Sequence, residues 1–379
     1  MDFKMKVGII TYHSSHNYGS MLQAYALSHF LISRGYDVEI IDFRSPKQLR
    51  LYKHPLRPRS FAFNKRYFKG LLYPYANPVW LFNECRKWSV YEKFVKDYLP
   101  VTKKRYNSWE SVLSDLNVLQ YNVLISGGDQ IWNMRGLHFD KAYYLDGKLD
   151  GIKKISYSTS FGGVFLNKIE KDEQEYIKNT LSDYSSISVR EVSMKNYLEP
   201  LLNMKVEVVV DPTLLLQVDD YDALIKDDPI VKGQYILYYS PFPNSKAENL
   251  AIMYGKYKEL KVVTTFPHII NNKGMTAIHK SGPSEFLNLL KNAAMVIGRS
   301  FHLIVFSLLY HKDFIAIDGA EDARMKDILM RVGLIDRGRV DVNNFDKIVL
   351  PPIDIKKIDD YFFQLRRESE DYLLNTLVL

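Results

Sequence analysis

The stretch "KVGIITYHSSHNYGSMLQAYALSHFLISRGYDVEIIDF" (residues 6–43) places a helical pattern between two apolar, β-branched runs. The first run covers residues 6–11 and the second residues 37–43. Between them a polar turn leads into apolar residues at helical spacing, and Gly35 ends the pattern: Leu22, Tyr25, Ala26, Phe30 and Leu31. This strand–turn–helix–strand order predicts the start of an open α/β sheet.

The same alternation recurs twice along the chain and predicts two Rossmann-like, doubly wound domains of the α/β class. We assign residues 1–216 to the first domain, with a basic and helical insertion at about 45–116. A second series of strands begins at 234–240 and gives a second domain over 217–350, followed by a C-terminal helix over 351–379. Ligands of such sheets bind beyond the carboxyl ends of the strands, so we expect the site in a cleft between the domains.

Composition excludes several classes of protein. Cys85 is the only cysteine, which excludes a disulfide framework and favours a reducing compartment. We find no signal peptide and no apolar run long enough to span a membrane, so the sequence predicts a cytoplasmic protein. The net charge of +7 is spread out except for a basic cluster at residues 44–69. This cluster could face an anionic substrate, nucleic acid or the inner face of a membrane, or be a solvated loop. No nucleic-acid-binding module accompanies it.

Three polar segments follow predicted strands and are candidates for ligand binding. The turn at residues 12–19 contains His13, Asn17 and Tyr18 before a helix, where Asn17 could also be a plain N-cap. The segment "ISGGDQIWN" (125–133) contains Asp129, Trp132 and Asn133, and its tryptophan could stack on a pyranose ring. In "SVRE" (188–191), Arg190 could bind a carboxylate or phosphate, or form a local ion pair with Glu191.

The fourth candidate is "GRSFHL" (298–303), which places His302 between a predicted buried strand and a buried helix. His302 could be a core residue, but the end of a strand and the first turn of a helix, with Arg299 nearby, favour a role in a site. We predict no metal site, because the spacing of His13 and His16 is not accompanied by further ligands. Nucleotide-binding glycine motifs and the nucleophile elbow are also missing from the sequence.

Together these segments resemble the polysaccharide pyruvyl transferase family. The resemblance runs in family order from residue 6 to about 337 through seven blocks: "TYHSSHNYGSMLQAYAL", "LISGGDQIWN", "SYSTSFG", "SVRE", "VVVDPTLLL", "GPSEFLNLLKNAAMVIGRSFHLIVFSLLYHKDFIAI" and "RMKDILMRVGLIDR". It implies a fold similar to the GT-B glycosyltransferases, with the acceptor bound by the first domain and the donor by the second.

The resemblance also implies an activity in bacterial exopolysaccharide biosynthesis. The pyruvyl group of phosphoenolpyruvate would pass to a hexose of a surface polysaccharide or its lipid-linked precursor, as a ketal, with release of phosphate and without a further cofactor. His302 would be the catalytic acid or base, and Arg190, Arg299 and Ser300 would bind the donor. The acceptor would be bound by His13, Asn17, Tyr18, Asp129, Trp132 and Asn133.

Two departures from the family pattern concern the block around His302. Many members have arginine where this chain has Ser300, so Arg299 is displaced by one position and could point away from the cleft. Leu303 replaces a preferred glycine and would narrow the space beside a phosphate. A glycosyltransferase that uses a nucleotide sugar is one alternative, with Glu321 as a weakly placed nucleotide-binding acid. A non-catalytic sugar-binding protein that uses Trp132 is another.

Overall fold

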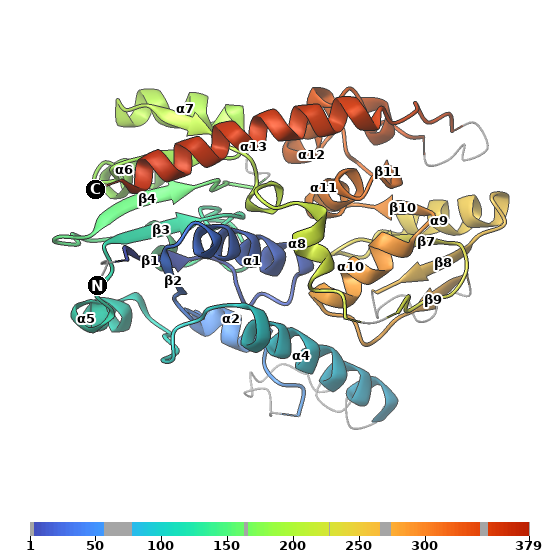
Figure 1. Cartoon of the computed structure of the whole chain (residues 1–379), viewed down its shortest axis with the longest axis horizontal. Coiled ribbons are helices and arrows are strands. Elements are labelled where there is room, and N and C mark those ends of the chain that lie inside the picture. Colours follow the sequence, from blue (N-terminus) through green and yellow to red (C-terminus); the bar gives the residue numbers. More distant parts are fainter. Residues whose placement is uncertain are drawn as a thin grey trace.

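The chain forms two parallel β-sheets that lie side by side (Figure 1). A computed structural model describes residues 4–56, 78–162, 166–226, 228–265, 274–341 and 348–378. The first sheet has the order β2-β1-β3-β4, and the pair β5-β6 continues it through single bridges from Ile155 to Ser186 and from Thr159 to Val189. These strands are β1 Lys6–Ile10, β2 Asp37–Ile40, β3 Val123–Gly127, β4 Lys153–Tyr157, β5 Ile187–Val189 and β6 Val206–Val208.

The second sheet has the order β11-β10-β7-β8-β9 and is also parallel. Its strands are β7 Tyr235–Tyr239, β8 Lys261–Thr264, β9 Met275–Ala277, β10 Met295–Gly298 and β11 Asp313–Ala316. The short strand β9 was not expected from the sequence. The strand order reverses between β1 and β3 in the first sheet and between β7 and β10 in the second. Two doubly wound α/β sheets are therefore confirmed, and each has a switch point, the position at which sheets of this class bind ligands.

The helices fill the space around and between the sheets. In the first half they are α1 Tyr18–Ser33, α2 Pro46–Leu51, α4 Pro78–Tyr98, α5 Trp109–Leu119, α6 Lys171–Leu181 and α7 Val192–Leu202. In the second half they are α8 Val218–Asp222, α9 Ser245–Tyr257, α10 Pro283–Asn292, α11 Phe301–Leu309, α12 Ala323–Arg331 and α13 Ile355–Leu377.

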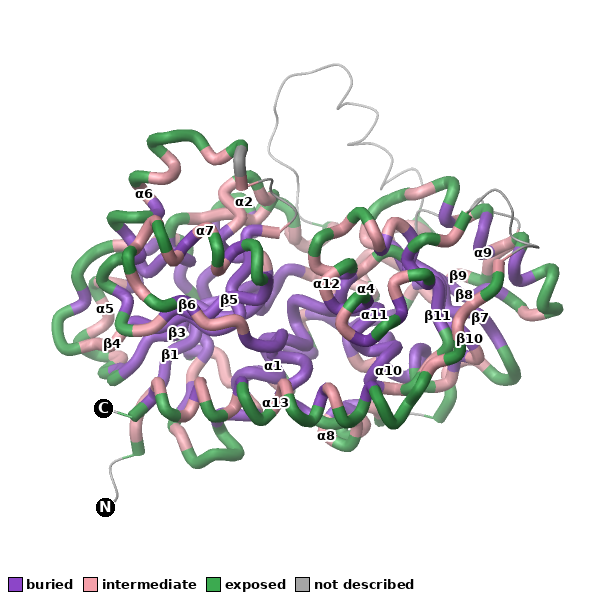
Figure 2. Tube along the Cα trace, turned by 90° about the horizontal axis from the view of Figure 1, so that it is seen from above, coloured by how far each residue is buried: buried purple, intermediate pink, exposed green. Residues whose placement is uncertain are grey.

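Helix α1 is more deeply buried than the sequence indicated. The pattern predicted one apolar face, but the helix is buried along most of its length because it lies between the first sheet and the second half (Figure 2). The side chain of Asn17 caps its first turn by accepting from the amide of Ser20, and Gly35 follows its last turn with a φ of 91°. Positive φ explains why glycine stands there.

A continuous apolar core joins the two halves. The Tyr18 ring of α1 stacks on Phe286 of α10 at 4.7 Å, and its hydroxyl lies 2.8 Å from Oγ of Ser281. Helix α13 returns from the second half along the first (Figure 1), where Ser369 Oγ accepts from the amide of Val210 at 3.0 Å. These contacts fix the carboxyl ends of the two sheets relative to each other.

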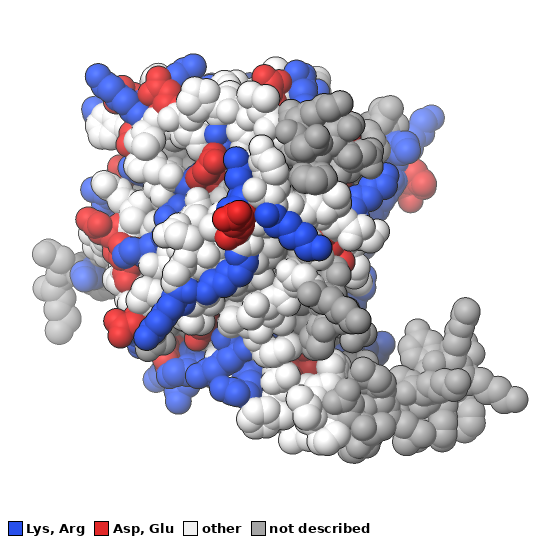
Figure 3. Space-filling model, turned by 90° about the vertical axis from the view of Figure 1, so that its right-hand side faces the viewer, with Lys and Arg blue, Asp and Glu red and all other residues white. Residues whose placement is uncertain are grey.

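Among the described residues on the face of the second half, basic, acidic and uncharged side chains lie next to one another (Figure 3). Residues 57–69 of the basic cluster lie outside the described part of the chain. Within its described part, Arg44 is buried and pairs with Asp42 and Glu92, so it faces an internal charge network and not an anionic partner. Among the described residues, no helix combines the length and apolar character needed to cross a membrane.

Candidate functional site

A cavity of about 640 Å³ lies at the switch points of both sheets. Residues that follow β1 and β3 line one side of it, and residues that follow β7 and β10 line the other. The N-caps of α1, α11 and α12 also line it, and these are Asn17, Ser300 and Asp322. Three helix N-termini therefore face one cavity, and that of α11, whose N-cap Ser300 makes no side-chain hydrogen bond to the helix, favours an anionic ligand.

His302 lies in the cavity surface at the first turn of α11 and is buried on its other sides. Its Nε2 is 3.6 Å from Oδ2 of Asp211, and the same oxygen is 2.6 Å from NH2 of Arg190. The Arg190 guanidinium lies over the Phe301 ring at 4.9 Å. His302, Asp211 and Arg190 thus form a buried row, with the carboxylate between the imidazole and the guanidinium, and the row ends at the cavity.

Asp211 is held in its ionised form. Burial raises the pKa of its carboxyl group, but Arg190 and His302 outweigh burial and hold that pKa well below its ordinary value. An ionised carboxylate beside Nε2 stabilises an imidazolium. The opposite ring nitrogen, Nδ1, lies against Gly19 in the first turn of α1.

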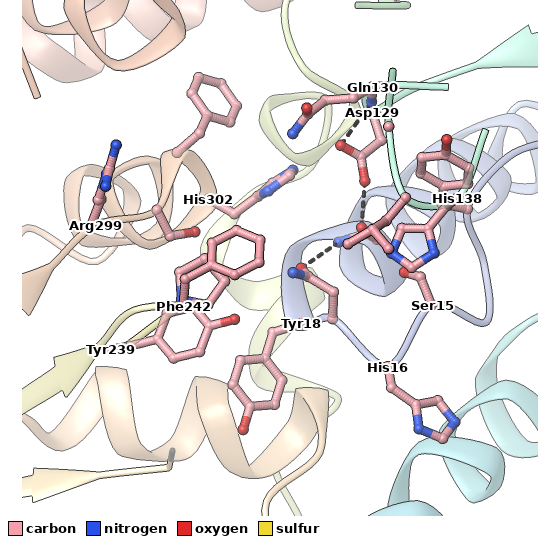
Figure 4. A pocket seen from close by; sticks show the side chains of 18 of the residues that line it. Ser15, His16, Tyr18, Asp129, Gln130, His138, Tyr239, Phe242, Arg299 and His302 are labelled. Carbon is pink, nitrogen blue, oxygen red and sulfur yellow. Dashed lines mark hydrogen bonds between the residues drawn. The ribbon is translucent and has the colours of Figure 1, made fainter. Parts of the chain in front are cut away.

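The opposite side of the cavity carries two further histidines, His16 and His138 (Figure 4). Nε2 of His16 lies 3.3 Å from Oε1 of Glu92, and Nε2 of His138 lies 3.0 Å from the hydroxyl of Tyr52. Burial lowers the pKa of both imidazoles, although Glu92 opposes this for His16. Both rings are therefore suited to accept a proton at neutral pH.

Several buried polar atoms at the cavity surface lack a hydrogen-bond partner among the described residues. Those of the first half are Tyr12 OH, Ser15 Oγ and His138 Nδ1. A buried polar group without a partner costs free energy. A polar ligand in the cavity would satisfy such atoms.

Three cationic side chains reach the cavity. Arg324 is largely buried and pairs with Asp322 at 3.0 Å, whereas Arg299 lies at the rim, half exposed, with Nε 3.3 Å from Asp318. Lys87 of α4 is the third, and burial lowers the pKa of its amine. The cavity therefore combines cations, helix N-termini and histidines.

The sequence matches the polysaccharide pyruvyl transferase family over residues 17–320. This match includes the turn after β3, the switch point of the second sheet and the block around His302. The chain belongs to the polysaccharide pyruvyl transferase family. It is therefore a transferase.

Solved structures resemble this family member in fold. A putative UDP-N-acetylglucosamine 2-epimerase from Listeria monocytogenes aligns over 97% of this chain and 90% of its own, with 8% identity and a TM-score of 0.53. The UDP-GlcNAc 2-epimerase from Neisseria meningitidis aligns over 100% and 95%, with 11% identity and a TM-score of 0.50. At such low identity the likeness concerns the fold alone, which is of the GT-B type. No curated protein matches the sequence.

Of the residues that the family resemblance implied, most lie in the cavity surface. The cavity is lined by His302, Arg299, Ser300, Asn17, Tyr18, Asp129 and Asn133. Asp129 has a φ of 56° and accepts hydrogen bonds from the hydroxyl of Ser20 and from the amide of Gln130. The polar turn after β1 and the turn after β3 are thereby joined. In Figure 4 the side chain of Arg299 points away from the histidines.

Three implied residues do not line the cavity. Trp132 is fully buried, and its indole N–H donates to Ser126 Oγ and to the carbonyl of Tyr143, each at 3.0 Å. It is part of the core and does not form the expected aromatic surface. His13 is buried with Nε2 2.9 Å from Oδ1 of Asp42. Arg190 pairs with Asp211, which lies beside His302 of the cavity surface.

Leu303 does not narrow the cavity. Its side chain is fully buried in the core, where its Cδ2 packs so closely on Gly298 that a Cβ there would lie 2.6 Å away. The concern that Leu303 crowds a phosphate is thus wrong, because the helix turns this position inward. Glu321, the weak candidate for a nucleotide-binding acid, is exposed and does not line the cavity.

Sequence reasoning missed several residues of the site. Asp211 lay within a recognised block, and an Asp-Pro pair after a strand could have marked it. Arg324 could have been marked by its place in the last block. His138, Tyr52 and Lys87 lie in segments without a motif, so only the folded chain reveals them. Within the described ranges, no group of three or more His, Cys, Asp or Glu side chains could hold a metal ion.

Proposed function

We propose that the protein transfers the pyruvyl group of phosphoenolpyruvate to a hexose as a cyclic ketal and releases phosphate. The observation that carries this proposal is the His302–Asp211 pair at a cavity where helix N-termini and cationic side chains converge. A donor with a phosphate and a carboxylate needs such a positive surface. The family match supports pyruvyl transfer in general terms.

The reaction needs two proton donors and two proton acceptors. C3 of the donor gains a proton, which makes C2 electrophilic, and the oxygen of one sugar hydroxyl then bonds to C2. The bond between C2 and the bridging oxygen breaks with its electron pair passing to phosphate, and a second hydroxyl closes the ketal. The two hydroxyls lose one proton each. Over the whole reaction, one of these protons balances the proton gained by C3, and the other leaves with the phosphate.

His302 is suited to the first proton transfer, to C3. The ionised Asp211 beside Nε2 stabilises the imidazolium, and Nδ1 on the side of Gly19 is free to deliver its proton. Asp211 itself stays ionised because Arg190 balances its charge. Arg190 therefore acts on the donor side indirectly, by holding the Asp211 carboxylate in place beside His302.

The donor's anionic groups fit the N-termini of α1 and α11, with Ser300 and Arg324 close by. Oγ of Ser300 makes no capping bond to its own helix and can donate to a phosphate oxygen. Arg324 supplies a largely buried cation, while Arg299 at the rim is shared with Asp318. The buried cation is the stronger candidate, since screening weakens an exposed one.

The acceptor fits the side of the cavity formed by the first half. Asn17, Asp129 and Asn133 offer hydrogen-bonding groups to a hexose. Phe242, exposed to 66%, lies at the cavity and can stack on a sugar face in place of Trp132. The acceptor would be a hexose of a surface polysaccharide or of its lipid-linked precursor, the latter reached at the inner face of the membrane.

Incubation with phosphoenolpyruvate and a panel of methyl galactosides, glucosides and mannosides tests this function. We expect phosphate release with at least one acceptor, together with a donor-induced rise in melting temperature. His302→Ala should reduce turnover by about 10²-fold or more while the melting temperature changes little. Absence of both release and thermal shift contradicts the proposal. A thermal shift with UDP or GDP instead would favour a nucleotide-sugar transferase.

A further inference from the structure

His16 is the second histidine of the cavity that is paired with a carboxylate. It belongs to the polar turn after β1, with a φ of 46°, and its ring stacks on Tyr91 at 4.8 Å and 9°. Its Nε2 faces Glu92 of α4 at 3.3 Å. Nδ1 makes no hydrogen bond to the described residues and is therefore the ring nitrogen available to a ligand.

Glu92 is fixed by a charge network that extends away from the cavity. NH1 of Arg44 donates to both of its carboxylate oxygens, at 2.8 and 3.0 Å. Nε of Arg44 donates to Asp42 at 2.7 Å, and Asp42 also lies 2.9 Å from His13. The network fixes the direction in which Nε2 of His16 points.

We propose that His16 is the base that accepts the proton of the acceptor hydroxyl, with Glu92 as the residue that positions it. This assignment rests on the proposed function. His302 and His16 lie on opposite sides of the pocket in Figure 4, so a donor and an acceptor can lie between the two residues.

The proton transfers then balance over one cycle. The imidazolium of His302 gives its proton to C3, and the first hydroxyl loses its proton to Nδ1 of His16 as its oxygen bonds to C2. The proton on His16 passes to the departing phosphate. The second hydroxyl returns a proton to His302 as the ketal closes. Both histidines end in their starting forms, and no further reactant is needed.

The charges around His16 suit a base. Burial lowers its pKa, Glu92 raises it, and Arg44 and Lys87 lower it, with the result that the pKa lies below its ordinary value. The imidazole is therefore neutral at neutral pH. His138 is a weaker candidate, because its Nε2 faces the Tyr52 hydroxyl and no carboxylate orients it.

Three variants test this assignment in the full-length protein. His16→Asn removes the imidazole but tolerates the positive φ, and should lower kcat by about 10²-fold or more with donor affinity nearly unchanged. Glu92→Gln should move the acid limb of the pH–rate profile to lower pH, because Glu92 raises the pKa of His16. Asp97→Asn, on the same helix but paired with Lys93, is the matched control and should leave the limb in place.

The outcomes separate this assignment from the proposed function. If the wild type releases phosphate and His16→Asn retains activity within about threefold, His16 is not the base although the function stands. If Glu92→Gln leaves the acid limb of the pH–rate profile in place, Glu92 is not the residue that positions His16. If the wild type neither binds phosphoenolpyruvate nor releases phosphate with any acceptor, the function and this assignment fail together.

Discussion

A Cβ atom on Gly19 would lie only 2.1 Å from Nδ1 of His302. Gly19 belongs to the first turn of α1 in the first half, and His302 belongs to the first turn of α11 in the second half. The imidazole therefore occupies the space that any other residue at position 19 would need. The two switch points can come into contact here because residue 19 is glycine and has no side chain.

Gly19→Ala should displace the His302 ring and reduce kcat by about 10²-fold, since displacement of an acid or base by about 1 Å is costly. The rest of the helix can stay in place, because alanine favours helical conformation. Kinetics of phosphate release, with the melting temperature measured in parallel, would check this. Activity near that of the wild type would show that the ring is not held in its working position by this contact.

Gly35→Ala is a control for the effect of stability. Gly35 has a φ of 91° and nothing within 4 Å of an added Cβ, so alanine there strains the backbone without touching the site. We expect a loss of about 1–2 kcal/mol in the free energy of unfolding with kcat unchanged. Lower stability alone would then not explain the loss of activity in Gly19→Ala.

The sequence predicted the fold well because strands and helices alternate with clear spacing. Strand β9 was missed because three residues without an apolar pattern carry no signal of their own. His302 could be placed at the cavity because a strand end and a helix start are both local features. Trp132 could not be placed correctly, because its indole is buried by Tyr144 and Tyr184, residues that lie outside its motif.

Leu303→Ala should destabilise the protein without improving donor binding. Leu303 is fully buried, and its truncation would leave a cavity in the core that costs about 2–5 kcal/mol. Urea unfolding measures this cost, and donor-induced thermal shift measures affinity. A variant that binds phosphoenolpyruvate more tightly at little cost in stability would show that Leu303 does restrict the cavity.

Phe242→Ala should weaken acceptor binding without loss of stability, whereas Trp132→Phe should lower stability without changing acceptor binding. The exposed ring of Phe242 can be removed with little change in melting temperature, but KM for the acceptor should rise about tenfold if it stacks on the sugar. Trp132→Phe removes a buried indole donor, so it should cost about 1–3 kcal/mol in stability and leave the acceptor KM unchanged. A raised acceptor KM for Trp132→Phe alone would contradict this assignment of roles.

Arg324→Gln should weaken donor binding more than Arg299→Gln. The Arg324 side chain is 14% exposed and that of Arg299 is 50% exposed, so solvent screens the second charge more. We expect the dissociation constant for phosphoenolpyruvate to rise about tenfold or more for Arg324→Gln, and about threefold or less for Arg299→Gln. Isothermal titration would measure both, and the reverse order would show that Arg299 turns inward when the donor binds.

Glu92 should contribute to stability in a way that depends on pH. Burial raises the pKa of its carboxyl group, but His16 and Arg44 lower that pKa by more, so it falls from an ordinary value of 4.5 to about 2. A depressed pKa in the folded state stabilises the protein above the pKa of the unfolded chain, and this contribution is lost as pH falls through the folded value. The unfolding free energies of wild type and Glu92→Gln should therefore converge between pH 4.5 and pH 2.

Urea unfolding at several pH values would measure this convergence, because carboxylates outside this network, such as Asp211, titrate in both proteins and largely cancel in the difference. A difference that stays constant or grows as pH falls would mean that Glu92 is not held ionised by Arg44 and His16. Glu92 can orient the His16 ring only if Arg44 holds its carboxylate ionised and in place. That result would therefore also remove the physical basis for assigning Glu92 a positioning role.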